Sequence, residues 1–175
     1  MKNVIIFLTS LCLFGCSAFP QKKIYTQIDI QAPKHIVWEI LEDIQSYEQW
    51  NPYHVKVEGK LKVGEKLSLY IHKPNQSKIH IKPHVMDIKP LTALTWGGGI
   101  TGIFYGEHVF ELDAISETST RVIQREKFEG LVIPFAELDT IEEGYILVNQ
   151  ALKRRAENNY LLQQQNTKKM EWLFQ

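Results

Sequence analysis

The chain has 175 residues, a length that fits one domain, and its 20 basic and 20 acidic residues give a formal net charge of zero. A neutral chain lacks the excess positive charge that nucleic-acid binding requires, so the composition argues against that class of function. The hydrophobic share of 44% and the charged share of 23% are those of a globular domain.

The N-terminal segment is interpreted as an export signal that is not part of the fold. An apolar run at 4–14 follows Lys2 and is too short to cross a bilayer comfortably. The run leads into Leu-Phe-Gly-Cys at 13–16, which resembles the lipobox of bacterial lipoproteins. This resemblance implies cleavage after Gly15 and a lipid on Cys16. The alternative is an ordinary secretory signal with an accidental cysteine.

These observations divide the chain into a lipoprotein signal peptide at 1–15, a lipidated tether at 16–22 and a folded part that follows. Ser17 comes directly after the cysteine, and in a Gram-negative lipoprotein this implies the outer membrane. We therefore expect the protein in the bacterial cell envelope, attached to a membrane by lipid. Cys12 and Cys16 are the only cysteines, so the folded part has no disulfide and depends on core packing.

The next segments are predicted in chain order from periodicity and turn residues. The expected elements are a strand at 24–30, a helix at 35–44, a short helix or turn at 46–52, strands at 53–58, 66–73, 78–88 and 93–96, and a hairpin of strands 107–115 and 121–128. Pro83 lies inside the 78–88 strand, where its missing N–H predicts a sheet edge or a bulge.

The last predicted element is a long amphipathic helix over 135–157. Its apolar stripe has helical spacing, acidic residues lead, basic residues close, and Pro134 stands just before it. The stripe consists of Phe135, Leu138, Ile141, Tyr145, Val148, Leu152 and Ala156. A helix so one-sided needs a broad apolar partner, which the strands supply. The fold class is therefore α+β, with a curved antiparallel sheet wrapped round the C-terminal helix and short helices near the N-terminus.

The order of these elements, together with particular residues, resembles the START-like, helix-grip superfamily called SRPBCC, and within it the bacterial polyketide cyclase-like members. The matching stretches are 32–33, 37–38, 47–52, Gly59, Gly64, Pro83, 94–96, 106–110, 126–130 and 149–153. The resemblance covers a helix-grip domain at 23–157, and the tail at 158–175 has no counterpart in it. It implies an apolar cavity that binds lipids, steroids, polyketides or similar compounds, with no fixed catalytic set and no cofactor.

The hairpin is the stretch that bears most directly on a site. Strand parity places Gln124 and Glu126 on the face toward the helix, and closing the hairpin puts His108 opposite one of them. A carboxylate in an apolar cavity needs a partner, so we expect a buried His–Glu pair. Such a pair can be structural, can orient a ligand, or can act as an acid and base.

The candidate site therefore combines the hairpin with neighbouring strand and helix residues. The predicted cavity residues are Trp96, His108, Phe110, Gln124, Glu126, Phe128, Tyr145 and Asn149. Glu126 and His108 are the catalytic candidates if there is any reaction. No metal site is expected, because His54, His72, His80 and His84 are scattered over strands without cysteines or clustered carboxylates.

The glycine-rich stretch at 97–104 is expected to be a loop. It lacks the Gly-Lys-Ser/Thr ending of a phosphate-binding loop and opens no helix. A flexible lid over the cavity is one interpretation and an ordinary mobile loop is the other.

Three functions remain open at this stage. The preferred one is an envelope-anchored protein that binds a hydrophobic small molecule or lipid without turnover. The alternatives are a cyclase-like or hydrolase-like enzyme that uses Glu126 and His108, and a structural lipoprotein that docks a partner through Trp172, Leu173 and Phe174 of its tail.

Overall fold

Eight antiparallel strands form the framework of the fold within residues 19–173, the part of the chain that this computed structural model describes. The predicted signal peptide and Cys16 lie outside that part. The strands are β1 (Gln21–Ile30), β2 (His54–Glu58), β3 (Ser68–His72), β4 (Lys78–Ile81), β5 (His84–Lys89), β6 (Ala93–Ile100), β7 (Phe104–Ser116) and β8 (Ser119–Glu129). A five-stranded sheet has the order β1-β8-β7-β6-β5, and a three-stranded sheet has the order β2-β3-β4.

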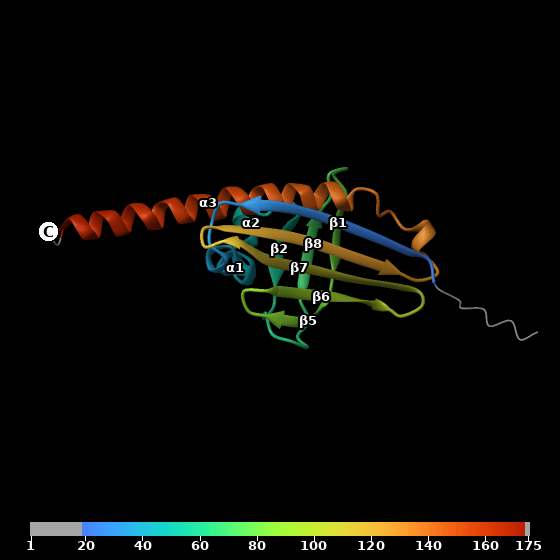
Figure 1. The fold of residues 1–175 in the computed structure, drawn as a ribbon. Coiled ribbons are helices and arrows are strands. Elements are labelled where there is room, and N and C mark those ends of the chain that lie inside the picture. Colours follow the sequence, from blue (N-terminus) through green and yellow to red (C-terminus); the bar gives the residue numbers. More distant parts are fainter. Residues whose placement is uncertain (1–18, 174–175) are drawn as a thin grey trace, which may run out of the picture.

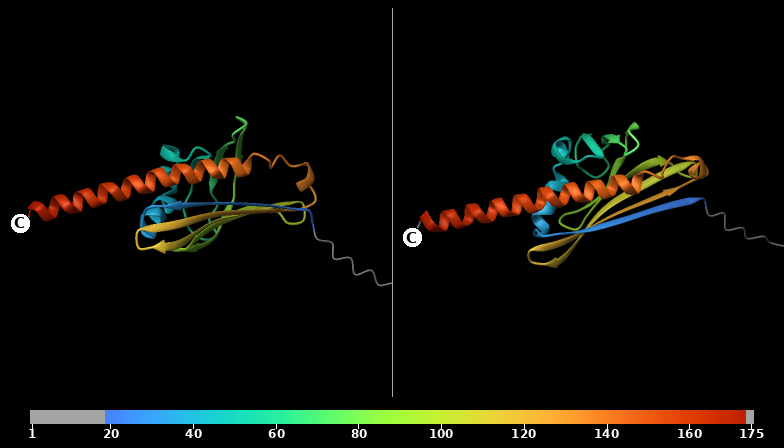
Figure 2. Two further views of the ribbon diagram at one scale, coloured as in Figure 1. Left: turned by 45° about the horizontal axis from the view of Figure 1, so that its top comes forward. Right: turned by 90° about the horizontal axis from the view of Figure 1, so that it is seen from above.

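The helices lie on one side of this framework (Figures 1 and 2). They are α1 (Lys34–Glu42), the 3₁₀ turn η1 (Ile44–Ser46), α2 (Tyr47–Trp50), the 3₁₀ turn η2 (Ile133–Phe135) and α3 (Ile141–Leu173). Figure 2 shows the five-stranded sheet curving beneath α3, with the short helices beside it. The α+β class and the grip of a curved antiparallel sheet on one long C-terminal helix are confirmed.

Backbone contacts join the two sheets into one curved surface. The Gly64 N–H donates to the Val85 carbonyl at 2.8 Å, and the Leu67 N–H donates to the Pro83 carbonyl at 2.9 Å. An isolated antiparallel bridge also links Lys66 and His84. The inner face of both sheets can therefore border one enclosed space under α3.

The single strand predicted over 78–88 is wrong. The chain breaks at 82–83, and the two pieces, β4 and β5, lie in different sheets. Pro83 cannot donate a ladder hydrogen bond, and here its carbonyl accepts from Leu67 instead. The proline therefore marks a change of sheet, rather than an edge or a bulge within one strand.

The predicted bounds of the long helix are also wrong at both ends. The helix begins at Ile141, because η2 includes Pro134 and Ala136 has an extended backbone with ψ of 139°. Phe135, placed on the apolar stripe by the sequence, is 87% exposed. From Ile141 onward the predicted stripe is buried: Ile141, Tyr145, Val148, Leu152 and Ala156.

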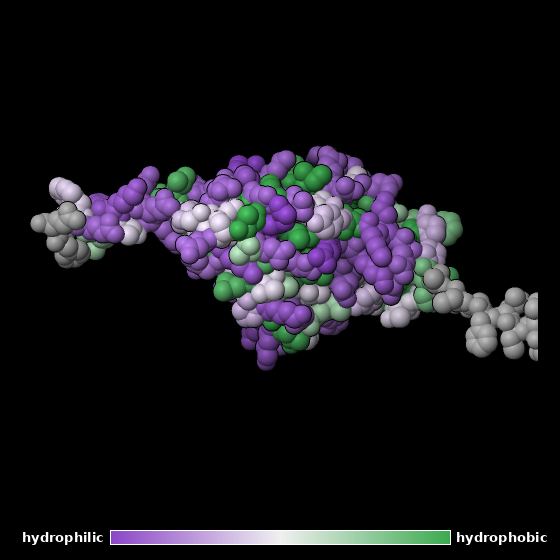
Figure 3. Space-filling view, viewed as in Figure 1, coloured by the Kyte–Doolittle hydropathy of each residue, from purple (hydrophilic) through white to green (hydrophobic). Residues whose placement is uncertain are grey.

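The second half of α3 extends past the sheet into solvent (Figure 1). The segment predicted as a separate tail at 158–175 is helical as far as Leu173, since no glycine or proline interrupts it. The extension is mostly hydrophilic, with isolated hydrophobic residues (Figure 3). None of the helices within residues 19–173 combines the length and apolar character that crossing a bilayer requires.

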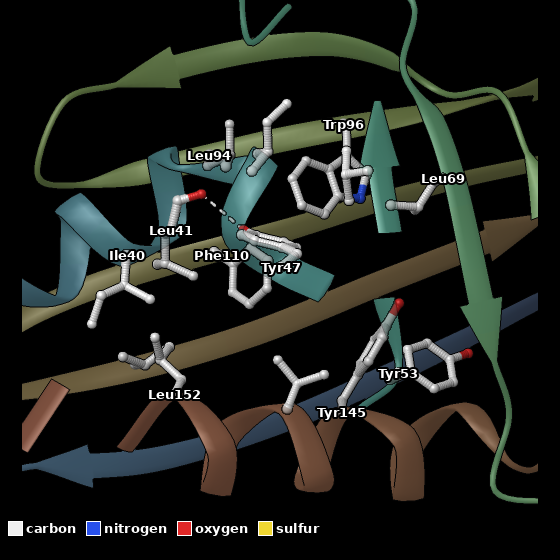
Figure 4. Close-up of a cluster of buried hydrophobic side chains, with 14 of the residues drawn as sticks. Ile40, Leu41, Tyr47, Tyr53, Leu69, Leu94, Trp96, Phe110, Tyr145 and Leu152 are labelled. Carbon is white, nitrogen blue, oxygen red and sulfur yellow. Dashed lines mark hydrogen bonds between the residues drawn. The ribbon is translucent and has the colours of Figure 1, made fainter. Parts of the chain in front are cut away.

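The core lies between the sheet, α1 and the first half of α3 (Figure 4). Leu94, Trp96 and Phe110 come from the sheet and are almost fully buried. The helix approaches closely at Gly144, where an added Cβ would lie only 2.3 Å from the Tyr53 ring. A glycine at this position allows the ring to pack directly on the backbone of α3.

The glycine-rich stretch is a hairpin end rather than a long loop. Gly97 and the residues up to Ile100 belong to β6, and only residues 101–103 form the turn into β7. The expectation of a loop over 97–104 is therefore wrong for most of its length. The hairpin of β7 and β8 is confirmed, with His108 directly opposite Glu126.

Candidate functional site

A cavity of about 560 Å³ lies between the curved sheet and the start of α3. Most of its lining is apolar and comes from both sheets and the helix: Leu69, Ile71, Ile79, Ile81, Trp96, Phe104, Phe128, Leu138 and Ile141. Its volume is in the range of pockets that bind drug-sized ligands. Four of these residues come from the three-stranded sheet and three from the five-stranded sheet, so the cavity depends on the way the two sheets join.

Glycine at an inner-face position of β6 leaves part of this space open. Gly98 of β6 pairs with Gly106 of β7, two residues beyond the pair of Trp96 and His108. Alternation along each strand points all four positions toward α3. Trp96 and His108 fill their part of the face and the Phe128 ring packs over Gly106, whereas an added Cβ on Gly98 would meet nothing closer than 3.5 Å.

The main polar contact at the cavity wall joins the sheet to the helix. The Tyr145 hydroxyl, from α3, donates a hydrogen bond to the Glu126 carboxylate, from β8. Burial raises the pKa of Glu126 to about 7, and the negative charge of Glu107 adds to the rise, while the hydrogen bond from Tyr145 opposes it. Near neutral pH this carboxyl group therefore divides between its protonated and ionised forms.

The expected pair of His108 and Glu126 is not formed. His108 Nε2 lies 3.2 Å from Gln124 Oε1, and Glu126 turns to Tyr145 instead. Burial lowers the pKa of His108 to about 4, although the bond to Gln124 opposes this change. His108 is therefore neutral at physiological pH, and its side-chain hydrogen bond goes to Gln124 rather than to Glu126.

A second buried histidine lies beside the first. The ring centroids of His54 and His108 are 5.8 Å apart, and both side chains border the cavity. Burial, and then the proximity of His108, hold the pKa of His54 well below its ordinary value. Asn51 fixes the backbone here, because its Oδ1 accepts from the N–H groups of Tyr53 and His54. The pair forms a neutral aromatic wall rather than a charged one.

Gln124 connects the sheet to α3 behind this wall. Its Nε2 donates to the Tyr145 carbonyl at 3.1 Å and to Asn149 Oδ1 at 2.7 Å. Asn149 in turn donates to Thr26 Oγ1 at 3.0 Å. Gln124 is 0% exposed, so this chain of hydrogen bonds lies in the core and is separate from the cavity.

A buried lysine lies at the rim. Lys73 Nζ donates to the Glu137 carbonyl at 2.9 Å, and the Glu137 carboxylate is 3.6 Å from the same nitrogen. Both residues border the cavity. The contact fastens the segment before α3 to the end of β3 and closes one side of the opening.

Comparison with sequence families identifies the chain. The profile of a family described as polyketide cyclase / dehydrase and lipid transport matches residues 21–157. The chain belongs to this family. No curated protein resembles it closely enough to count as a match.

Solved structures share the fold of this polyketide cyclase family member at low sequence identity. The ZhuI aromatase/cyclase from Streptomyces sp. R1128 is 16% identical with a TM-score of 0.66, over 79% of this chain and 94% of its own. Norcoclaurine synthase from Thalictrum flavum is 12% identical with a TM-score of 0.62, over 81% and 98%. Ginseng major latex-like protein 151, from Panax ginseng, is 16% identical with a TM-score of 0.60, over 81% and 98%.

The family assignment confirms the resemblance given by the sequence, whereas the predicted lipoprotein features stay predictions. Of the predicted cavity residues, the structure brings five to the cavity wall: Trp96, His108, Glu126, Phe128 and Tyr145. Phe110, Gln124 and Asn149 lie behind it and are fully or almost fully buried.

Sequence reasoning missed Tyr53, His54 and Lys73 as wall and rim residues. His54 was considered only as a metal ligand, and within residues 19–173 no group of three or more His, Cys, Asp or Glu side chains is placed to hold a metal ion. The signal at Tyr53 and His54 was the asparagine and proline just before them, which mark the start of an inward strand. No sequence pattern indicated that Lys73 would lie at the cavity rim.

Proposed function

We propose that this protein binds a hydrophobic small molecule or lipid in its cavity and does not convert it. The cavity itself is the observation that supports this proposal, because its walls are largely apolar and its volume is about 560 Å³. Membership of a family that includes lipid transport points in the same direction. The Glu126–Tyr145 pair supplies one polar contact that can orient a ligand along the apolar walls.

Two measurements test the binding proposal. Native mass spectrometry of the purified protein should detect a bound apolar compound, and the neutral fluorescent probe N-phenyl-1-naphthylamine should bind and become brighter. The proposal fails if the protein contains no such compound and takes up no probe.

A substitution at Gly98 tests whether the probe occupies this cavity. Gly98→Trp places a ring in the empty part of the inner face, and the nearest atom to the new Cβ, the Cα of Pro83, lies at an ordinary 3.5 Å. We expect probe binding at least ten-fold weaker. Thr95→Trp is the matched control, since Thr95 points to the outer face of the same strand, and its probe affinity should equal that of the wild type. Equal affinity in both variants would contradict the assignment.

We also propose that the protein is held in the cell envelope by lipid on Cys16. The support is the Leu-Phe-Gly-Cys sequence at 13–16 after an apolar run. The intact mass of protein extracted from membranes should show a chain that begins at Cys16 and carries added acyl groups. A mass that corresponds to an unmodified chain would contradict this.

The second candidate function is an enzyme, and the pKa of Glu126 favours it. A carboxyl group with a pKa of about 7 inside an apolar cavity can give or take a proton near neutral pH. Since His108 is bonded to Gln124 and the Tyr145 hydroxyl donates to Glu126, Glu126 would act with Tyr145. If an apolar compound that co-purifies is converted, Glu126→Gln should reduce turnover at least 100-fold and leave binding intact. Undiminished turnover would exclude this role.

A further inference from the structure

Six exposed hydrophobic side chains gather at the end of the molecule where β1 begins. They come from three separate segments and form what we call the apolar end: Phe19, Ile100, Ile103, Leu131, Val132 and Phe135. Leu131 is 62% exposed and Phe135 is 87% exposed. Hydrophobic surface is visible in Figure 3 at this end, beside the point where the chain leaves the described part.

Backbone hydrogen bonds and close packing hold the three segments together. The Gly130 N–H donates to the Pro20 carbonyl at 3.1 Å, and the Leu131 N–H donates to the Gly102 carbonyl at 3.0 Å. The Phe19 ring covers Gly102, because an added Cβ there would lie 3.3 Å from it. The apolar end is therefore one continuous surface rather than three independent loops.

This surface is free of charge. No Asp, Glu, Lys or Arg occurs in 17–20, 97–106 or 130–136. The charges that flank these segments are partly paired, since Lys22 lies 3.6 Å from Asp139 and the Glu137 carboxylate lies 3.6 Å from Lys73 at the cavity rim. Exposed apolar patches rimmed by polar residues mark interaction sites for proteins or membranes.

The apolar end also borders the cavity opening. Gly99, Phe104 and Ala136 line the cavity, and they are the chain neighbours of Ile100, Ile103 and Phe135. A flat apolar partner that covers the apolar end would therefore come to lie against the cavity mouth.

The course of the chain favours a lipid surface as that partner. The apolar run at 4–14 and Cys16 immediately precede Phe19, which is itself part of the apolar end. Whatever holds the N-terminal segment in a bilayer brings the apolar end to that bilayer. The lack of charge matches insertion among acyl chains rather than attraction to anionic headgroups.

We propose that the apolar end docks on a phospholipid bilayer, with its six side chains among the acyl chains and the cavity mouth facing the lipid. Entry of the ligand from the membrane rests on the proposed binding function. Docking does not, although the choice of a bilayer as partner rests on the proposed membrane attachment of the N-terminal segment.

Fluorescence quenching in phosphatidylcholine vesicles tests the docking. The full chain is used with Cys12→Ser and Cys16→Ser, which remove the native thiols, and its flotation with the vesicles is verified before the fluorescence is read. A bimane label is attached at Leu131→Cys, or at Thr118→Cys in the exposed turn between β7 and β8 at the opposite end. With lipid that carries a nitroxide at carbon 5 of an acyl chain, the label at position 131 should be quenched at least two-fold more than the label at position 118.

A charged variant separates docking from mere tethering. Adding Ile103→Asp and Phe135→Asp should reduce quenching at position 131 to the level seen at position 118, while the chain still floats with the vesicles. Equal quenching at the two ends, or quenching unaffected by the aspartates, would overturn the proposal. The proposal would also be overturned if, without vesicles, the label at position 131 became buried as the protein concentration rises. A second copy of the chain would then be the partner of the apolar end. Cavity binding of N-phenyl-1-naphthylamine by the same variant, measured without vesicles, shows whether the binding function holds independently.

Discussion

Replacing Gln124 by leucine should destabilise the protein by about 4 kcal/mol, because two buried polar side chains lose a partner and one further bond to α3 is lost. The two side chains are the imidazole of His108 and the amide of Asn149, and the further bond is the one that the Tyr145 carbonyl accepts in addition to its helix bond. Each buried group left without a hydrogen bond costs roughly 1–3 kcal/mol, and partial relaxation reduces the sum. Urea unfolding followed by the circular dichroism of α3 measures the change.

Two further variants show whether the network, rather than the shape of the side chain, is responsible. Gln124→Leu combined with Asn149→Leu removes both amides, so its cost should be smaller than that of the single substitution by about 1 kcal/mol or more. Arg125→Leu is the matched control on the outer face of β8, where only a surface contact with Glu111 is lost, and it should change stability by less than about 1 kcal/mol. A cost for Gln124→Leu no larger than that of the control would refute the structural role.

The fold was largely predictable because each strand carries its own alternation and the turn residues between strands are strong. The β7–β8 hairpin illustrates this, since its inner residues Val122, Gln124 and Phe128 are buried as parity requires. Two of the errors occur at prolines, and the others concern the glycine-rich stretch at 97–104 and the C-terminal end of the long helix. Pro83 and Pro134 each mark a break whose geometry depends on tertiary contacts, so their positions alone could not tell a bulge from a change of sheet or a helix start from a 3₁₀ turn.

The site was only half predictable, for a physical reason that the hairpin also shows. The predicted register placed His108 opposite either Glu126 or Gln124, and the structure pairs it with Glu126, but a side chain can reach a diagonal neighbour as well as the residue directly across. Which of these residues the side chain contacts depends on which side chains of α3 face the sheet at that point. The Tyr145 hydroxyl binds Glu126, so His108 contacts Gln124 instead. This choice of partners depends on how α3 is rotated over the sheet, which local sequence patterns do not predict.

The contribution of the second sheet was hidden for a similar reason. Leu69 and Ile71 of β3 line the cavity because the two sheets meet through the backbone at Gly64 and Leu67. Alternation in β3 predicts one buried face but not what that face covers. A wall made by long-range curvature therefore cannot be assigned from local patterns.

The second large effect concerns the ionisation of Glu126. Its pKa is raised from an ordinary 4.5 to about 7 in the folded protein, so the folded state binds a proton that the unfolded state has already lost. Stability from this group is therefore complete below about pH 4.5 and falls as the pH rises toward about 7. Well above pH 7 the loss amounts to about 3 kcal/mol.

Glu126→Gln should remove this loss, because the amide keeps an acceptor for the Tyr145 hydroxyl and does not ionise. We expect the variant to be about 3 kcal/mol more stable than the wild type at pH 8 and nearly equal to it at pH 4.5. Burial lowers the pKa values of His54 and His108, so these groups make stability rise with pH over part of the same range. Because both proteins contain them, the difference between the two unfolding free energies isolates Glu126.

Chemical denaturation at pH 4.5, 6 and 8 provides the measurement. Glu111→Gln, the same change on the outer face of β7, loses only a surface ion pair with Arg125 and should not acquire the stability gain that grows with pH. If the difference between wild type and Glu126→Gln were the same at all three pH values, the carboxyl group would titrate normally. Glu126 would then be ionised at neutral pH, and the cavity would present a charged carboxylate, rather than a neutral acid, to any apolar ligand.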